Sequence, residues 1–355
     1  MARTTVAVVF GGRSSEHAIS CVSAGAIIGA LDPARYDVVR VGISRDGQWA
    51  LDHRDPADLA IVDGVLPEAV PAGDLVAPLP AEAASGYLAS VDVIFPVLHG
   101  PWGEDGTVQG LFELAGVPYV GSGVMSSSVT MDKAAMKSML RAAGLPVGPY
   151  EVITDRQWRL EQQQSLARVE ALGFPVFVKP ARAGSSMGIS KVASRDGLRS
   201  AIDEARLHDP KVVVEAAIAD GREIECGVIT DDTGAARASR CAEIVVHGEH
   251  EFYDFTAKYL DASADLVVPA QLEPAVEAEV QALACRAFEA LGCEGLARAD
   301  FFVTPSGILI NELNTMPGFT PSSMFPRMWA ASGVDYPTLV SHLVDDALRR
   351  GTGLR

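Results

Sequence analysis

Four polar side chains near the carboxyl end of the chain have the types and spacing of a metal site. Arg298 and Asp300 alternate with apolar residues in RADFFVTPS, and Glu312 and Asn314 alternate in GILINELN, which follows directly. If the two segments pair as antiparallel strands, all four side chains lie on one face. Facing carboxylates repel, so they require a cation, and two carboxylates with one neutral amide suit Mg2+ that also holds phosphate oxygens. We therefore predict Asp300, Glu312 and Asn314 as metal ligands.

The pairing of these two strands follows from the turn between them. Pro305-Ser306-Gly307 suits a three-residue loop in which proline opens a type I turn and glycine takes the left-handed position. Thr304 then faces Ile308, and counting outward puts Asp300 opposite Glu312. The other face is predicted to carry Phe301, Val303, Leu309 and Leu313. The alternative is a plain solvated face on an edge hairpin, because any half-exposed antiparallel pair alternates in this way.

A lysine followed by a glycine- and serine-rich loop forms a second candidate site. The apolar segment 174–179 ends on Lys179 and leads into PARAGSSMG, and a new strand begins at Ile189. Loop N–H groups and hydroxyls can wrap phosphate oxygens while the lysine supplies charge, as in a P-loop but without its spacing. We expect a hairpin lid over a triphosphate, with Ser185 and Ser186 at its tip.

Two further segments could contact the same anion or its base. Asp132 is expected to cap a helix that ends at Gly144, with Lys133 in its first turn. A lysine there opposes the helix dipole, which suits a bound anion; a solvated surface lysine is the alternative. The strand 212–215 ends at Glu215 and continues as Ala-Ala-Ile, where a carboxylate and exposed backbone could hold adenine or ribose.

Two loops near the amino end could bind a small polar ligand. The strand 6–10 leads into GGRSSEH and a helix, so a glycine-rich turn and a serine cap would leave N–H groups free, with Glu16 at the mouth of a parallel sheet. The strand 91–97 ends in LHGPWGEDG, which contains His99. The alternatives are glycines that only turn the chain and a structural histidine.

The elements that position these residues form more than one unit. Strands at 6–10, 36–44 and 91–97 alternate with helices, as in an open α/β sheet. A long helix from Pro274 to Gly292 precedes the hairpin, and the aromatic, charged segment 251–260 reads as a loop with side chains available to a ligand. A chain of 355 residues predicts two or three domains.

The composition of the chain limits the classes of partner that it can bind. The net charge is -17 and lysine and arginine form no run, which argues against nucleic acid or an anionic membrane surface and favours a small molecule. The five cysteines are scattered without a CxxC pair, so they predict thiols in a reducing compartment. No long apolar segment precedes the first strand, so we expect neither a signal peptide nor a membrane helix, and the cytoplasm follows.

Seven segments in a fixed order resemble the D-alanine:D-alanine ligases of the ATP-grasp superfamily. They are GGRSSEHAIS, LHGPWGEDG, the MDK helix, VKPARAGSSMG, YDFTAKYL, RADFF and NELNTMPGFTPSS. The resemblance implies an α/β fold with α+β elements, the ATP-grasp fold, with an amino-terminal open parallel-sheet domain. The expected domains are 1–121, 122–215 and 216–355.

The resemblance also implies a reaction and roles. ATP phosphorylates the carboxylate of a first D-alanine, and the amine of a second attacks the acyl phosphate. ATP contacts are assigned to Lys133, Lys179, Ser185, Ser186, Glu215, Ala217, Ile218, Glu223, Lys258 and Phe302. Two Mg2+ or Mn2+ ions are assigned to Asp300, Glu312 and Asn314. The D-alanine contacts are Glu16, His99, Arg298, Ser323 and Met324, and the catalytic set is Glu16, Ser185, Tyr259, Arg298 and Gly318. A homodimer is expected.

Substrate choice and two departures complete the prediction. Relatives that make D-alanyl-D-lactate lack the loop tyrosine found here as Tyr259, which favours an amine as second nucleophile. Ala183 replaces a glutamate common in the lid, and Ala216 replaces an adenine-contacting lysine, so nucleotide affinity could differ. Three alternatives stay open: a depsipeptide ligase, a non-catalytic nucleotide-binding protein, and a serine hydrolase built on Ser185, although no GxSxG elbow frames that serine.

Overall fold

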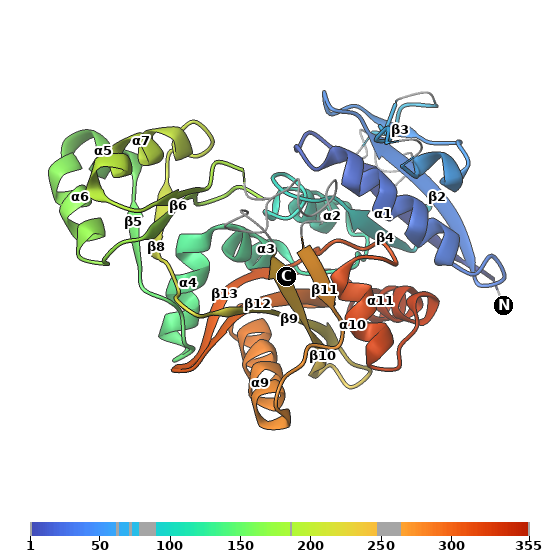
Figure 1. Ribbon diagram of the computed structural model, residues 1–355. Helices are drawn as coiled ribbons and strands as arrows, with labels where there is room; N and C mark the ends of the chain where they lie inside the picture. Colours follow the sequence, from blue (N-terminus) through green and yellow to red (C-terminus); the bar gives the residue numbers. More distant parts are fainter. Residues whose placement is uncertain are drawn as a thin grey trace.

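The computed structural model describes residues 2–61, 64–70, 73–77, 90–184, 187–246 and 264–353. Within these ranges the chain forms three β-sheets flanked by helices (Figure 1). The amino-terminal sheet, drawn in blue, lies beside the red carboxyl-terminal helices, and the central sheet with its green helices lies apart from both. No helix in the described ranges is long and apolar enough to cross a membrane.

The amino-terminal sheet has the strand order β3-β2-β1-β4, with β1 parallel to β2 and β4 and with β3 antiparallel. Its elements are β1 (Thr4–Gly11), α1 (His17–Ala30), β2 (Tyr36–Ile43), β3 (Trp49–Leu51), η1 (Pro56–Leu59), β4 (Val93–Val97) and α2 (Thr107–Ala115). Residues 6–10 are fully buried, because helices cover both faces of a parallel sheet. The three predicted strands are confirmed to within two residues at each end, and β3 was not predicted.

The predicted serine cap of α1 is wrong. The helix is capped by Glu16, whose side chain makes no capping hydrogen bond. Ser14 Oγ instead accepts a hydrogen bond from the Glu16 N–H (3.2 Å) and donates one to the His99 carbonyl (2.6 Å). The serine therefore ties the loop after β1 to the loop after β4, where parallel strands end at the same edge of the sheet.

Two helices, α3 (Val124–Met131) and α4 (Lys133–Ala142), connect the amino-terminal sheet to the central one. Asp132 caps α4 as predicted, since its Oδ1 accepts hydrogen bonds from the Ala134 and Ala135 N–H groups, both at 3.1 Å. The buried side chains Met136 and Leu140 pack against the carboxyl-terminal sheet. This helix therefore lies between two sheets (Figure 1).

The central sheet is antiparallel, with the strand order β5-β8-β6-β7. Its elements are β5 (Tyr150–Ile153), α5 (Asp155–Leu160), α6 (Gln162–Glu170), β6 (Val176–Pro180), β7 (Ser190–Val192), α7 (Arg195–Ala205) and β8 (Val212–Ala216). The predicted hairpin of β6 and β7 is confirmed. Ser185 and Ser186, in the loop between them, lie outside the described residues. The domain limits at 121 and 215 remain predictions.

The carboxyl-terminal sheet is antiparallel, with the strand order β11-β10-β9-β12-β13. Its elements are β9 (Arg222–Thr230), β10 (Ala236–Val246), β11 (Ala264–Val267), α9 (Pro274–Ala290), β12 (Leu296–Thr304), β13 (Gly307–Asn314), α10 (Met324–Ala331) and α11 (Tyr336–Arg350). The long helix predicted to start at Pro274 is α9, which covers one face together with α4. Helix α10 covers part of the other face.

The β12–β13 hairpin has the predicted outer register and a different turn. Thr304 pairs with Gly307, so the loop has two residues and the predicted pairing of Thr304 with Ile308 is wrong. A β-bulge between Asp300 and Phe301 on β12 then leaves Asn311 as an extra residue on β13, and Asp300 faces Glu312 as predicted.

The bulge also changes which side chains share a face. Leu309 pairs with Phe302 and lines the same cavity as Asp300, so its predicted place on the opposite face is wrong. Ile308 and Ile310 take that place and are buried against α9, together with Phe301 and Leu313 as predicted. The predicted register was therefore correct at the outer end of the hairpin, where Asp300 faces Glu312, and wrong from Phe301 to the turn.

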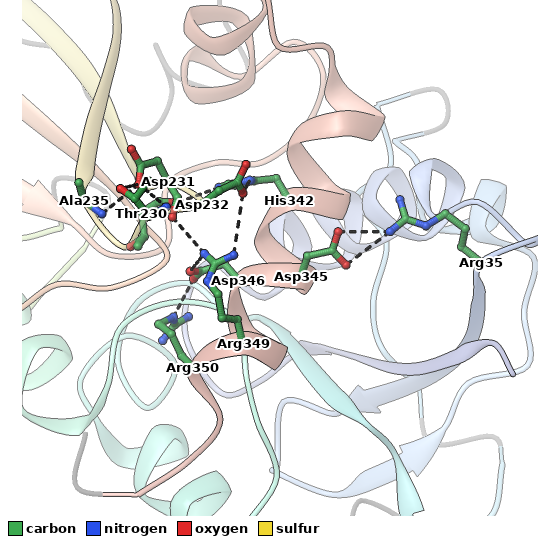
Figure 2. A network of polar contacts seen from close by, with 11 residues as sticks. Arg35, Thr230, Asp231, Asp232, Ala235, His342, Asp345, Asp346, Arg349 and Arg350 are labelled. Atoms are coloured by element: carbon green, nitrogen blue, oxygen red, sulfur yellow. Dashed lines mark hydrogen bonds and ion pairs between the residues drawn. The ribbon is translucent and has the colours of Figure 1, made fainter. Parts of the chain in front are cut away.

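One apolar cluster, here called the joint core, connects the amino- and carboxyl-terminal sheets. Most of its members come from β1, β4, α1, β9, β10, α10 and α11, and they include Val6, Val8, Phe10, Ile27, Phe95, Ile229, Ile244, Phe325, Trp329, Leu339 and Leu343. A polar network extends the joint along α11 (Figure 2). Asp345 contacts Arg35 of the amino-terminal part (3.2 Å), and the fully buried Asp346 accepts hydrogen bonds from Arg349 (2.8 Å) and Arg350 (2.7 Å).

Candidate active site

A cavity of about 850 Å3 lies where the three sheets meet. Its walls contain the predicted site residues from all three: Glu16, His99, Lys133, Lys179, Glu215, Ala217, Ile218, Glu223, Arg298, Asp300, Phe302, Glu312, Asn314, Gly318, Ser323 and Met324. Four predicted residues, Ser185, Ser186, Lys258 and Tyr259, lie outside the described residues. The described members of the predicted set therefore share one cavity, while their individual roles remain predictions.

Three lysines and one glutamate form the wall made by α4 and the central sheet. Glu215 at the end of β8 lies 2.9 Å from Lys179 Nζ and 3.2 Å from Lys137 Nζ. Lys137 also donates a hydrogen bond to the Asn311 carbonyl (2.8 Å), at the bulge of β13. Lys133 Nζ donates to the Ala183 carbonyl (3.0 Å) at the base of the predicted lid. Cationic groups from α4 and from the central sheet thus face the cavity.

The pKa shifts of this cluster show how the charges depend on one another. Burial would raise the pKa of Glu215, but Lys137 and Lys179 lower it to about 2. Burial would lower the pKa of Lys179, but Glu215 and Glu312 raise it. For Lys137, which is 2% exposed, burial outweighs the attraction of Glu215 and lowers the pKa. Glu215 is therefore ionised, and it holds the two lysines at the cavity wall.

The predicted metal ligands lie on the opposite wall, on β12 and β13. Asp300 faces Glu312 across the ladder, and Asn314 Nδ2 donates a hydrogen bond to Asp300 (3.3 Å). Glu312 lies 3.6 Å from Lys133 Nζ, so its carboxylate points toward the lysine wall. Within the described ranges no three His, Cys, Asp or Glu side chains form a group that could hold a metal alone.

These residues fit Mg2+ that is shared with phosphate oxygens. Carboxylate and amide oxygens are hard donors, and Mg2+ in nucleotide sites takes only one or two carboxylates from the protein and the rest of its ligands from phosphates and water. Asp300 already accepts three hydrogen bonds, two from Arg298 and one from Asn314, so a bound cation would compete with these donors for its oxygens.

Arg298 lies between two carboxylates on the same wall. Its Nε and Nη2 donate to both oxygens of Asp300 (2.7 Å each), and Nε lies 3.2 Å from Glu225 Oε1 on β9. Burial would lower the pKa of Arg298, but Asp300 and Glu225 raise it well above its ordinary value. The guanidinium is therefore a fixed, permanent positive charge at the cavity.

The amino-terminal wall is joined to the loop after β13 through the backbone of Met316. His99 Nδ1 donates a hydrogen bond to the Met316 carbonyl (3.0 Å), and Glu104 Oε1 accepts one from the Met316 N–H (3.2 Å). Burial lowers the pKa of His99, so its ring is neutral and Nε2 can accept a hydrogen bond from Ser23 Oγ (3.4 Å). Burial, followed by the charge of Glu16, raises the pKa of Glu104 to about 8.

Glu16 lies where the amino-terminal wall meets the base of the lid. A Cβ atom added at Gly184 or at Gly100 would lie 2.6 Å from Glu16 Oε2 in either case. Both backbones therefore approach the carboxylate as closely as only glycine allows. This contact brings the lid, the helix α1 and the loop after β4 together at one carboxylate.

Apolar side chains form a narrow part of the cavity beside the lysines. A Cβ added at Gly221 would meet Ile218 Cγ2 at 3.2 Å and Phe302 Cδ1 at 3.3 Å, so these two side chains flank the glycine. Phe177 and Leu309 also line the cavity. The Ala217 N–H donates to the Pro175 carbonyl (3.0 Å), so this N–H group is not available to a base. Apolar walls with aromatic side chains suit an aromatic base.

The last wall comes from the loop before α10. A Cβ added at Gly318 would lie 3.2 Å from Ser323 Oγ, which also accepts a hydrogen bond from the Thr320 N–H (3.1 Å). Met324 is the first residue of α10, and its side chain is buried in the joint core. A ligand contact by Met324 must therefore use its backbone.

Four charged residues of the cavity were not predicted: Glu104, Lys137, Lys191 and Glu225. Lys137 follows Lys133 by one helical turn on the face that carries Met136, and a lysine among buried positions is rare enough to have been a signal. Glu104 belongs to the acidic loop after β4, which was singled out without a role for this residue. Glu225 alternates with Glu223 in REIEC, which puts both on one strand face.

Two family models together match most of the chain. The model described as D-ala D-ala ligase N-terminus matches residues 5–122, and the one described as D-ala D-ala ligase C-terminus matches residues 139–345. The chain is 57% identical to the D-alanine--D-alanine ligase of Mycobacterium sp. (strain KMS), covering 99% of this chain and 98% of the relative. It is 56% identical to that of Mycobacterium avium (strain 104), covering 99% of both.

Solved structures agree in fold. The D-alanine-D-alanine ligase from Coxiella burnetii has a TM-score of 0.80 and 34% identity, over 99% of this chain and 95% of that one. VanG D-Ala:D-Ser ligase from Enterococcus faecalis has a TM-score of 0.82 and 34% identity, over 98% and 100%. The predicted fold class is confirmed by these likenesses together with the one mostly parallel and two antiparallel sheets.

Proposed function

The chain belongs to the D-alanine--D-alanine ligase family, and we propose that it joins two D-alanine molecules to D-alanyl-D-alanine for peptidoglycan precursors, at the expense of ATP. The observation that carries the proposal is the single cavity in which Glu16, the lysine wall and the β12–β13 ligands face one another. A site for an amino acid, a site for phosphates and a site for a cation are adjacent there, as transfer of a phosphoryl group to a carboxylate requires.

In the first step the carboxylate of one D-alanine attacks the γ-phosphorus of ATP, which forms D-alanyl phosphate and releases ADP. Glu16 binds the ammonium of this D-alanine, and Lys133 and Lys179 hold phosphate oxygens. The base lies between Ile218 and Phe302, with Glu223 near the ribose. Asp300, Glu312 and Asn314 would hold Mg2+, which when bound would neutralise phosphate charge. The protein contributes position and electrostatics, which account for most catalysis in phosphoryl transfer.

In the second step the amine of another D-alanine attacks the acyl carbon, and phosphate leaves after a tetrahedral intermediate. Arg298 and the Gly318 N–H stabilise the oxygen that becomes negative, and the region of Ser323 and Met324 holds the second carboxylate. The close contact of Gly184 with Glu16 supports a site that closes by lid movement. Closure keeps water from the acyl phosphate, which would otherwise hydrolyse.

The experiment is phosphate release from ATP with D-alanine, L-alanine, D-lactate and D-serine in parallel. We expect release with D-alanine alone, together with the dipeptide by mass spectrometry. The D-serine arm is included because one similar structure is a D-Ala:D-Ser ligase. Incorporation of D-lactate at neutral pH would identify a depsipeptide ligase, and no release with any substrate would favour a non-catalytic nucleotide-binding protein. A cytoplasmic homodimer is part of the proposal; light scattering that gives a monomer mass contradicts the dimer.

The cation assignment has its own test. Glu312→Gln is expected to lower turnover by at least about 100-fold, the scale of one strong electrostatic contact to transition-state charge. The measurement is the rate of phosphate release as Mg2+ is titrated. Phosphate release at the wild-type rate at limiting Mg2+ would contradict the assignment of Glu312.

A further inference from the structure

Glu225 contacts the proposed catalytic arginine from a strand that the predicted site did not include. On β9 it lies directly opposite Asp300, and its side chain is 5% exposed. Its Oε1 lies 3.2 Å from Arg298 Nε, which also donates to Asp300 Oδ1 at 2.7 Å. Arg298 is therefore held from two strands, by a neighbour on its own strand and by Glu225 across the ladder.

Register alone suggests a different role for Glu225. Glu225, Asp300 and Glu312 form one row across β9, β12 and β13, which resembles a three-carboxylate metal site. What the structure shows for Glu225 is a contact with the arginine: Arg298 Nε lies 3.2 Å from its Oε1 and 2.7 Å from Asp300 Oδ1. The role argued here for Glu225 therefore starts from Arg298.

Asp300 has two tasks that compete. Both of its oxygens accept hydrogen bonds from Arg298, and the same oxygens are the proposed ligands of Mg2+. A cation draws on the electron density that the hydrogen bonds use, so it weakens the hold of Asp300 on the guanidinium. Glu225 is not among the proposed Mg2+ ligands, so we expect its contact with Arg298 to remain when the cation is bound. A buried charge-assisted contact of this kind contributes more than a surface ion pair.

We propose that Glu225 is a positioning residue for the ligation reaction, which holds the Arg298 guanidinium toward the carboxylate being activated while Asp300 binds the cation. The role rests on the proposed function and deepens it. Glu225 touches no substrate in this assignment and acts only through Arg298. Loss of its charge should therefore affect transition-state stabilisation and leave nucleotide binding intact.

The first test is Glu225→Gln, which keeps the size of the side chain and removes its charge. We expect kcat for D-alanyl-D-alanine synthesis to fall roughly 10- to 50-fold, the range of a lost hydrogen bond to a charged group, with KM for ATP within about 2-fold. Glu225→Asp keeps the charge on a shorter side chain and should lose less. It also tests the role if Glu225→Gln does not fold. Full kcat in Glu225→Gln would overturn the proposal.

The second test asks whether Glu225 acts through Arg298. Arg298→Ala and the double variant Glu225→Gln/Arg298→Ala should have the same kcat within about 2-fold, because contacting residues that act as a unit are not additive. The same cycle measured by urea unfolding without Mg2+ or substrates should also be non-additive. Multiplicative losses in kcat would show that Glu225 acts independently, and would overturn the positioning role.

The matched control is Glu243→Gln. Glu243 accepts hydrogen bonds from Arg222 at 2.7 and 2.6 Å in the same sheet, and it does not line the cavity. We expect its kcat to stay within about 2-fold, because neither Glu243 nor Arg222 lines the cavity. An inactive wild type would overturn the proposed function together with this role, whereas an active wild type with an unimpaired Glu225→Gln would overturn the role alone.

Discussion

The amino- and carboxyl-terminal sheets share one hydrophobic core, whereas the central sheet has a core of its own. The joint core takes residues from β1 near the start of the chain and from α11 near its end. The buried members of the central core all lie between Ile153 and Val214. Two parts separated by more than a hundred residues are therefore fused, while the segment between them is self-contained.

The connections between the central sheet and the rest of the molecule are of a different kind. A small apolar cluster of Ala134, Ala181 and Val213 links α4 to the central sheet. The remaining links are mostly polar: Lys211 to Asp132, Lys137 to Glu215, Lys133 to Ala183, and Gly184 at Glu16. Separating polar groups that water can solvate costs less than exposing an apolar core. The cavity lies along this mostly polar boundary, here called the seam. A site that must open for ATP and close for chemistry is expected at such a boundary.

Two matched leucines test whether the cores are independent. Leu343 on α11 and Leu198 on α7 are both fully buried, the first in the joint core and the second in the central core. Each change to alanine should cost about 2–5 kcal/mol of unfolding free energy. Leu343→Ala should accelerate amide hydrogen exchange in both β1 and β9. Leu198→Ala should accelerate exchange in β6 and β8 alone. Faster exchange of β1 in Leu198→Ala would show that the molecule has one cooperative core.

The seam should weaken in acid through Glu215. Its folded-state pKa of about 2 lies below its ordinary 4.5, so its ionised form stabilises the fold above pH 4.5, and this contribution disappears as the pH falls toward 2. The shift corresponds to about 3 kcal/mol. In urea unfolding, the difference between wild type and Glu215→Gln should be of that size at pH 7 and narrow between pH 4.5 and 2. A difference that stays constant over this range contradicts the role of the charge.

The smallest expected effect is that of a substitution at Gly184, whose backbone contacts Glu16. In Gly184→Ala the added Cβ would lie 2.6 Å from Glu16 Oε2, so the carboxylate must move. We expect kcat to fall about 10-fold, which is 1.4 kcal/mol, with the unfolding free energy unchanged. Gly197→Ala on α7 is the control, since its added Cβ meets Val192 at an ordinary 3.5 Å. Equal kcat values for the two variants would mean that the Gly184 contact is not part of closure.

The sequence predicted the outer end of the metal hairpin better than its middle and its turn. Alternating polar residues at 298, 300, 312 and 314 defined the outer register, and that register is confirmed. The loop is one residue shorter than predicted and β13 is one residue longer by its bulge, so the two errors cancel. Ile308, Leu309 and Ile310 are all apolar, and a run without alternation gives no sign of where a bulge falls.

Residues whose role depends on distant packing were not predictable in the same way. Lys137 is a site residue only because β8 brings Glu215 to α4. Glu225 is one only because β9 lies beside β12. Local patterns indicate which strand face a side chain takes, but not which strand comes to lie next to it. The serine cap failed for a related reason, because Ser14 bonds to a loop 85 residues away.

During synthesis, α1 and β4 leave the ribosome long before α11, which packs against both. Val6 and Val8 pack in a cluster that also needs Leu339 and Leu343 of α11. Domains generally fold in the order in which they emerge. Here the first sheet must keep part of one face uncovered until the last helix has been made, whereas the central sheet can bury its whole core once Val214 has emerged. The central sheet can therefore bury its core before the amino-terminal sheet does. Until α11 is made, the amino-terminal sheet exposes apolar surface that a chaperone could bind.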